Sequence, residues 1–130
     1  MRITQDASAY HSIIWFAVDD NGHIIVANSN EGTIPDFVIE DEEKAEFLAQ
    51  KLLGIKAVDR NRNPQLSEKS IAEKGFYYFA VSDPYEDSIY RLIAKPGKPV
   101  NADEFDDGIR QILLNQKIGI NAETAVSFKI

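Results

Sequence analysis

The 130-residue chain contains no cysteine, and this absence removes whole classes of chemistry. Without thiols it has no disulfide framework, no thiolate nucleophile and no sulfur ligand for zinc or an iron–sulfur cluster. Histidine is scarce as well: His11 and His23 are the only side chains that ordinarily titrate near neutral pH. Neither lies in a HExxH-like spacing, and His11 and Ser12 would point to opposite faces of a strand. The sequence therefore predicts no catalytic residue, no metal site and no cofactor.

Long apolar runs and basic residues are also lacking. No run approaches the roughly 20 residues that span a bilayer, and the first residues lack the basic and then apolar pattern of a signal peptide. The 14 Lys and Arg stand against 21 Asp and Glu, which gives a formal charge of −7. This charge repels phosphate backbones and anionic lipid headgroups. We therefore expect a cytoplasmic protein that binds neither nucleic acid nor membranes.

Motifs for nucleotides and calcium are missing too. Gly97-Lys98 lies outside any phosphate-binding loop pattern, and the chain has no Gly-x-Gly-x-x-Gly fingerprint. The Asp-Asp-Asn-Gly run ending at Gly22 resembles part of an EF-hand loop until its register is checked. With Gly22 as the loop glycine, the first and twelfth ligand positions fall on Ala17 and Asn28. Neither residue carries a carboxylate, so the run predicts a turn.

Two hairpin patterns dominate what the chain does contain. In the first, Asn21 and Gly22 tolerate the positive φ angles of a tight turn, while Asp19 and Asp20 can accept hydrogen bonds from its backbone. His23 follows this turn, where we expect a residue that faces solvent. In the second, an aromatic and β-branched run at 76–82 is typical of a strand that is covered at least partly on both faces. The predicted strands cover residues 15–18, 23–26, 76–82, 88–94 and, from the alternation of Val126, Phe128 and Ile130, residues 122–130.

Capping residues predict the helices. Asp41 can begin a helix that Gly54 ends, and Phe47 falls opposite its buried face, where it either packs beneath a loop or contacts a partner. Asn101 and Glu104 form a capping-box pattern for a second long helix that ends near Gly119. A short helix is expected at 67–74, and an extended segment, interrupted by its proline, at 34–39.

These elements predict one domain covering residues 1–130. The fold class is α+β: an antiparallel sheet of about five strands, built from two hairpins and a C-terminal strand, with two main helices packed largely on one face. Regular strand–helix–strand alternation is absent, which argues against a doubly wound parallel sheet.

Tyrosines and acids gather at the second hairpin. Its tyrosines are Tyr77, Tyr78, Tyr85 and Tyr90, and its turn carries Asp83, Glu86 and Asp87. Two or three of the tyrosines are expected in the core. The others are of the type enriched in interface hot spots, and the acids can steer a basic partner. We predict a binding site for a basic protein partner at Asp83, Tyr85, Glu86 and Asp87.

Residues 16–24, 32–38, 76–78 and 90–96 resemble segments of small bacterial domains of the kind found as immunity proteins beside polymorphic toxins. This resemblance implies a domain that neutralises a toxin by binding it, and it supplies no catalytic residues. Residues 18–28 are similar to the opening hairpin of PAS sensor domains. However, a PAS domain continues through several short helices, whereas this chain has a long early helix.

The leading hypothesis is a non-catalytic protein-interaction domain, of the immunity-protein kind, with homo-oligomerisation left open. The first alternative is a PAS-like small-molecule sensor. The second is an enzyme, which would require His11 or His23 to converge with carboxylates.

Overall fold

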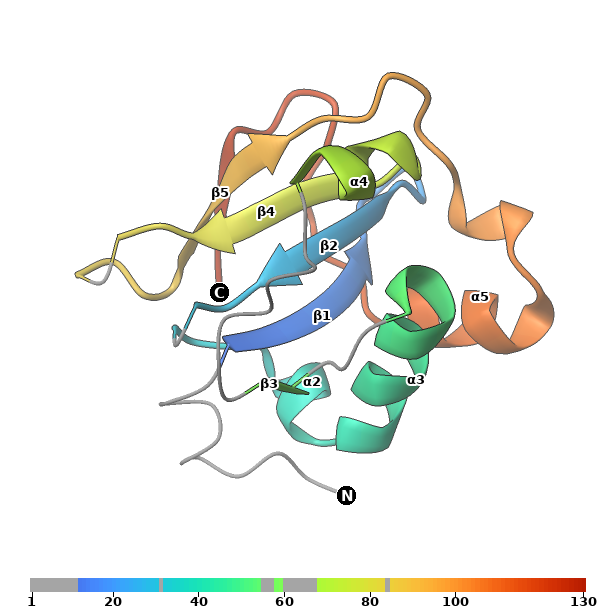
Figure 1. Cartoon of the computed structure of the whole chain (residues 1–130), viewed down its shortest axis with the longest axis horizontal. Helices are drawn as coiled ribbons and strands as arrows, with labels where there is room; N and C mark the ends of the chain where they lie inside the picture. Colours follow the sequence, from blue (N-terminus) through green and yellow to red (C-terminus); the bar gives the residue numbers. More distant parts are fainter. Residues whose placement is uncertain (1–11, 31, 55–57, 60–67, 84) are drawn as a thin grey trace.

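The fold is built on a mixed β-sheet, seen in a computed structural model that describes residues 12–30, 32–54, 58–59, 68–83 and 85–130 (Figure 1). The sheet has the strand order β3-β1-β2-β4-β5-β6, and the edge strand β3 has only two residues. Their bounds are β1 Ser12–Val18, β2 Ile24–Asn28, β3 Val58–Asp59, β4 Tyr77–Val81, β5 Ile89–Ala94 and β6 Ser127–Lys129. The helices are α2 Asp36–Ile39, α3 Glu42–Leu53, α4 Glu68–Glu73, the 3₁₀ helix η1 Ala102–Glu104 and α5 Asp107–Leu114. The α+β prediction is confirmed.

Both predicted hairpins form. β1 pairs antiparallel with β2, with Phe16 opposite Val26, and Gly22 in the turn has a φ of 84°. β4 pairs antiparallel with β5, with Phe79 opposite Leu92. Every residue of β4 is buried, as the aromatic run predicted.

The two hairpins meet differently from the prediction. β2 and β4 are parallel, with Val26 opposite Tyr78, so the sheet is mixed and not wholly antiparallel. Parallel neighbours need a long crossover, and the chain between these strands supplies one through α2, α3 and α4. Alternating apolar residues report which side of a strand is buried but not its direction. The pattern could therefore not predict this pairing.

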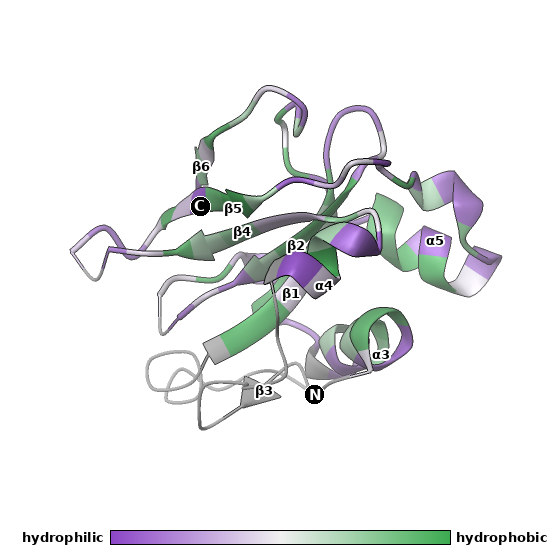
Figure 2. Ribbon diagram, turned by 45° about the horizontal axis from the view of Figure 1, so that its top comes forward, coloured by the Kyte–Doolittle hydropathy of each residue, from purple (hydrophilic) through white to green (hydrophobic). Residues whose placement is uncertain are grey.

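Helix α3 matches its sequence signals. The Asp41 side chain accepts a hydrogen bond from the Lys44 amide, and Gly54 ends the helix with a φ of 68°. The two longest helices, α3 and α5, both pack against β1, whereas α4 packs against β4 and β5. In Figures 1 and 2, α3 and α5 lie at the opposite end of the molecule from the turn between β4 and β5.

Residues 36–39 form a short helix where an extended segment was predicted, and that prediction was wrong. Pro35 sits at the N-cap with a φ of −72°, and its carbonyl accepts from the amides of Val38 and Ile39. Proline lacks an amide hydrogen, but a residue at this position needs none. The proline therefore begins a helix here.

The second long helix is divided in the structure. The predicted capping box between Asn101 and Glu104 is present, but it encloses only η1, because Phe105 is extended. Asp106 then caps α5 by accepting from the amide of Ile109 at 3.0 Å. Helix α5 ends before residues 116–118, whose backbone bonds with Val18 of β1.

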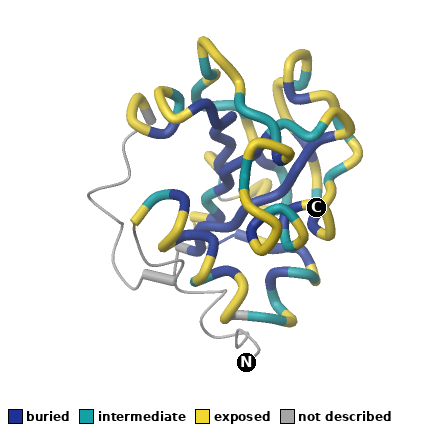
Figure 3. Tube along the Cα trace, turned by 90° about the vertical axis from the view of Figure 1, so that its right-hand side faces the viewer, coloured by how far each residue is buried: buried dark blue, intermediate teal, exposed yellow. Residues whose placement is uncertain are grey.

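The core occupies both faces of the sheet. On one face Trp15 makes edge contacts with Phe37, Tyr90 and Phe128. On the other, Phe16 contacts Phe76. Hydrophobic residues line β1 in Figure 2, and the buried segments run through the middle of the molecule in Figure 3. Within the described ranges, no helix combines the length and the apolar character needed to cross a membrane.

Candidate functional site

The second hairpin brings the four predicted binding residues together on one turn. Asp83, Tyr85, Glu86 and Asp87, which we name the acidic tip, follow β4 and precede β5. The Asp83 carbonyl accepts from the Glu86 amide at 3.0 Å, and its carboxylate accepts from the Tyr85 amide at 2.9 Å. Figure 1 shows the turn projecting from the sheet. The tip is therefore a hydrogen-bonded turn.

Burial separates the tyrosines clearly. Tyr77, Tyr78 and Tyr90 are core residues, in agreement with the expectation that two or three would be. Tyr85 is 96% exposed, so its ring and hydroxyl are open to a partner. The side chain combines a large apolar surface with a polar end. It is the tyrosine of this hairpin that can act in binding.

The carboxylates of the tip are held by neighbouring side chains. The Glu86 carboxylate lies 3.2 Å from the guanidinium of Arg91, and both side chains are 44% exposed. The hydroxyl of Thr33 donates to the Asp87 carboxylate at 3.5 Å. The Glu86–Arg91 ion pair is exposed and contributes little to stability, and both acids remain accessible to a partner.

A second cluster surrounds His23, which the sequence predicted to face solvent. That prediction was wrong, since only 16% of the side chain is exposed. Its Nδ1 lies 3.2 Å from the Asp19 carboxylate, and its Nε2 lies 3.7 Å from that of Glu123. The ring also contacts Tyr77 at 5.7 Å between centroids. His11 lies outside the described residues.

The convergence of a histidine with carboxylates, which an enzyme would require, is thus present at His23. Each ring nitrogen, however, already faces a carboxylate. The Asp19 carboxylate also accepts from the amides of Asn21, His23 and Ala122 at 2.8–2.9 Å. The cluster therefore ties the first turn to the C-terminal segment. The sequence places Glu123 about a hundred residues away, so no local signal could reveal this contact.

These hydrogen bonds control the ionisation of Asp19. Burial by itself raises the pKa of the carboxyl, but the amides of Ala122, His23 and Asn21 and the His23 ring outweigh burial and lower the pKa overall. The folded protein therefore holds Asp19 in its charged form more strongly than the unfolded chain does.

A pH dependence follows from this lowered pKa. Asp19 contributes stability that is fully present above the unfolded value of about 3.9 and is lost as the pH falls through the folded value. We expect Asp19→Asn, which cannot titrate, to differ most from the wild type near neutral pH and less below about pH 4. Urea unfolding at a series of pH values measures this difference. A gap that does not change with pH would contradict the prediction.

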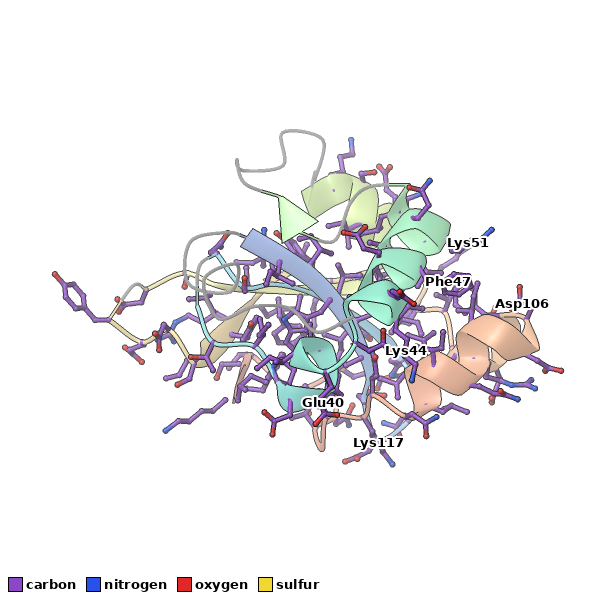
Figure 4. All side chains as sticks on the ribbon, turned by 90° about the horizontal axis from the view of Figure 1, so that it is seen from below. Glu40, Lys44, Phe47, Lys51, Asp106 and Lys117 are labelled. Carbon is purple, nitrogen blue, oxygen red and sulfur yellow. The ribbon has the colours of Figure 1, made fainter. Side chains whose placement is uncertain are left out.

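A third surface lies on the exposed side of α3. Figure 4 shows Lys44, Phe47 and Lys51 along this helix. Phe47 is 38% exposed, opposite the buried face as predicted, and the Lys51 ammonium lies 6.0 Å from its ring centroid. The ammonium lies within cation–π distance of the ring, and a single exposed apolar side chain of this kind is ordinary.

No family model matches the chain, and no curated protein or solved structure matches it. The roles of its residues therefore rest on geometry. Among the described residues, no group of three or more His, Cys, Asp and Glu side chains is placed to hold a metal ion.

Proposed function

We propose that this chain is a non-catalytic protein-interaction domain that binds a basic partner through the acidic tip. The observation that carries the proposal is Tyr85, which is 96% exposed and lies among three carboxylates on a hydrogen-bonded turn. Tyrosine is enriched in interface hot spots because it offers a large contact area at a small entropic cost. An aromatic face can also receive a cation.

Charge supports the same partner class. The formal charge of −7 attracts a basic protein over a distance, and the acids of the tip concentrate this charge beside the contact residue. A basic toxin is one partner with this chemistry, so we propose the immunity-protein role as the specific form of the function. The proposal also places the protein and its toxin partner in the cytoplasm. An adjacent toxin gene would support this role over that of a PAS-like sensor.

The proposal is tested by removing the tip chemistry while keeping the turn. We expect a variant with Asp83→Asn, Tyr85→Ala, Glu86→Gln and Asp87→Asn to fold normally, because each of these side chains is at least partly exposed. Its affinity for an oligolysine peptide should fall about tenfold or more, the loss of roughly one hot-spot contact. Fluorescence polarisation of the labelled peptide measures the affinity.

A matched control removes the same number of acids elsewhere. Glu40→Gln, Glu43→Gln and Asp103→Asn change three exposed carboxylates outside the tip. These changes should lower the affinity only slightly. Equal losses of affinity in the two variants would show that the tip contributes only through the net charge of the protein. Unchanged binding by the tip variant would refute the proposal.

A further inference from the structure

The acidic tip rests on a second loop that joins β2 to α2. We name Ser29, Asn30, Gly32 and Thr33 the support loop. The Asn30 side chain donates to the carbonyl of Val81, at the end of β4, at 2.7 Å. The amide of Thr33 donates to the Asp87 carbonyl at 2.8 Å. The support loop therefore holds both the beginning and the end of the turn.

Gly32 allows the two loops to approach closely. A Cβ atom at Gly32 would clash with the carbonyl oxygen of Asp87 and would lie 2.9 Å from that of Ser29. Both contacts are with backbone, which cannot rotate away as a side chain can. Only glycine fits this contact without a shift of the tip.

The contacts continue from the support loop into the core. The Thr33 carbonyl accepts from the Tyr90 hydroxyl at 2.6 Å, and the same hydroxyl accepts from the Trp15 indole at 3.1 Å. Tyr90 is 0% and Trp15 1% exposed, so the hydroxyl and the indole N–H are shielded from solvent. Burial raises the pKa of Tyr90, which keeps the hydroxyl protonated and able to donate.

We propose that the support loop presets the shape of the acidic tip and couples it to the buried Tyr90–Trp15 pair. This inference rests on the proposed function, because it assigns Thr33 and Tyr90 as positioning residues for the same interaction. A turn fixed before binding loses less conformational entropy when a partner arrives, which slows dissociation. Because these contacts are connected, a change at Asp87 alters the position of Thr33, and so the hydrogen bonds of Tyr90 and Trp15.

Trp15 is the single tryptophan of the chain, so its indole N–H resonance reports this coupling directly. In the protein without a partner, Asp87→Ala removes the carboxylate that accepts from the Thr33 hydroxyl at 3.5 Å and should shift that resonance. Asp103→Ala, at an exposed position outside these contacts, should not. In a Tyr90→Phe background, which keeps the ring but removes the bridging hydroxyl, Asp87→Ala should produce no further shift. A shift that persists in this background would overturn the coupling.

A binding experiment separates the inference from the function on which it rests. With the oligolysine peptide, Thr33→Val should raise the dissociation rate several-fold at an unchanged association rate, and Thr33→Ser, which keeps the hydroxyl, should behave like the wild type. If the peptide binds but valine and serine behave alike, the inference fails and the proposed function stands. If the peptide does not bind at all, both fail.

Discussion

Replacement of Asp19 by alanine is expected to lower the free energy of unfolding by about 3 kcal/mol, because each buried donor left without an acceptor costs about 1–3 kcal/mol. The Asp19 side chain is 0% exposed, and its two oxygens accept from three backbone amides and the His23 ring. Alanine would leave these donors without an acceptor. The unpaired amide of Ala122 would carry the largest free-energy cost, since that residue is fully buried and its amide cannot bond to water instead.

The neighbouring acid provides a matched control. Asp20 is exposed, and its carboxylate lies 3.7 Å from the ammonium of Lys117 in an exposed ion pair. Asp20→Ala should therefore change stability by no more than about 0.5 kcal/mol. Urea denaturation of both variants at neutral pH compares them. Similar midpoints for the two would show that Asp19 does not hold the turn to the C-terminal segment.

Asp19 also marks the limit of what the sequence could predict. Its role in the turn follows from the Asp-Asp-Asn-Gly run, because such residues accept hydrogen bonds from nearby amides. Its bond to Ala122 spans 103 positions and could not be predicted. Hydrogen bonds within a turn can be predicted from neighbouring residues, whereas a contact between distant residues depends on how the whole chain packs.

The same division applies to the fold. The hairpins and α3 were predictable because turn residues, caps and apolar spacing lie within each element. The parallel pairing of β2 and β4 was not, since it depends on the path of the chain between them. The predicted second long helix was divided, because the capping box at Asn101 encloses only η1 and Asp106, five positions later, caps α5.

For the candidate site, the sequence could predict the acidic turn but not the surroundings of its residues. Tyr85 could be predicted to be exposed because it lies in the acidic turn, whereas the burial of Tyr77, Tyr78 and Tyr90 depends on how the sheet packs. The contact between the support loop and the acidic tip was not predicted. Gly32 lies in a segment with ordinary turn composition, and its contact with Asp87 arises because the parallel pairing brings the end of β2 beside the end of β4.

Replacement of Phe128 by alanine is the second large expected effect, a loss of about 3–5 kcal/mol in unfolding free energy. The residue is 6% exposed, and its ring stacks on Tyr90 with a centroid distance of 5.1 Å and contacts Phe79 at 5.0 Å. Strand β6 has three residues, and Phe128 is its one buried side chain. The loss of unfolding free energy therefore measures how much the packing of β6 contributes to stability.

Val126 is the natural control, because the sequence pattern placed it on the same face as Phe128. In the structure it precedes β6 and is 74% exposed. Val126→Ala should therefore cost no more than about 0.5 kcal/mol. Chemical denaturation followed by Trp15 fluorescence compares the two variants, since the Trp15 and Phe128 rings are 6.1 Å apart. If Val126→Ala lowered the free energy of unfolding as much as Phe128→Ala, Val126 would be buried on the same face as Phe128, as the alternation predicted. A large loss for Phe128 alone would show that burial, and not alternation, decides which of these side chains stabilises the sheet.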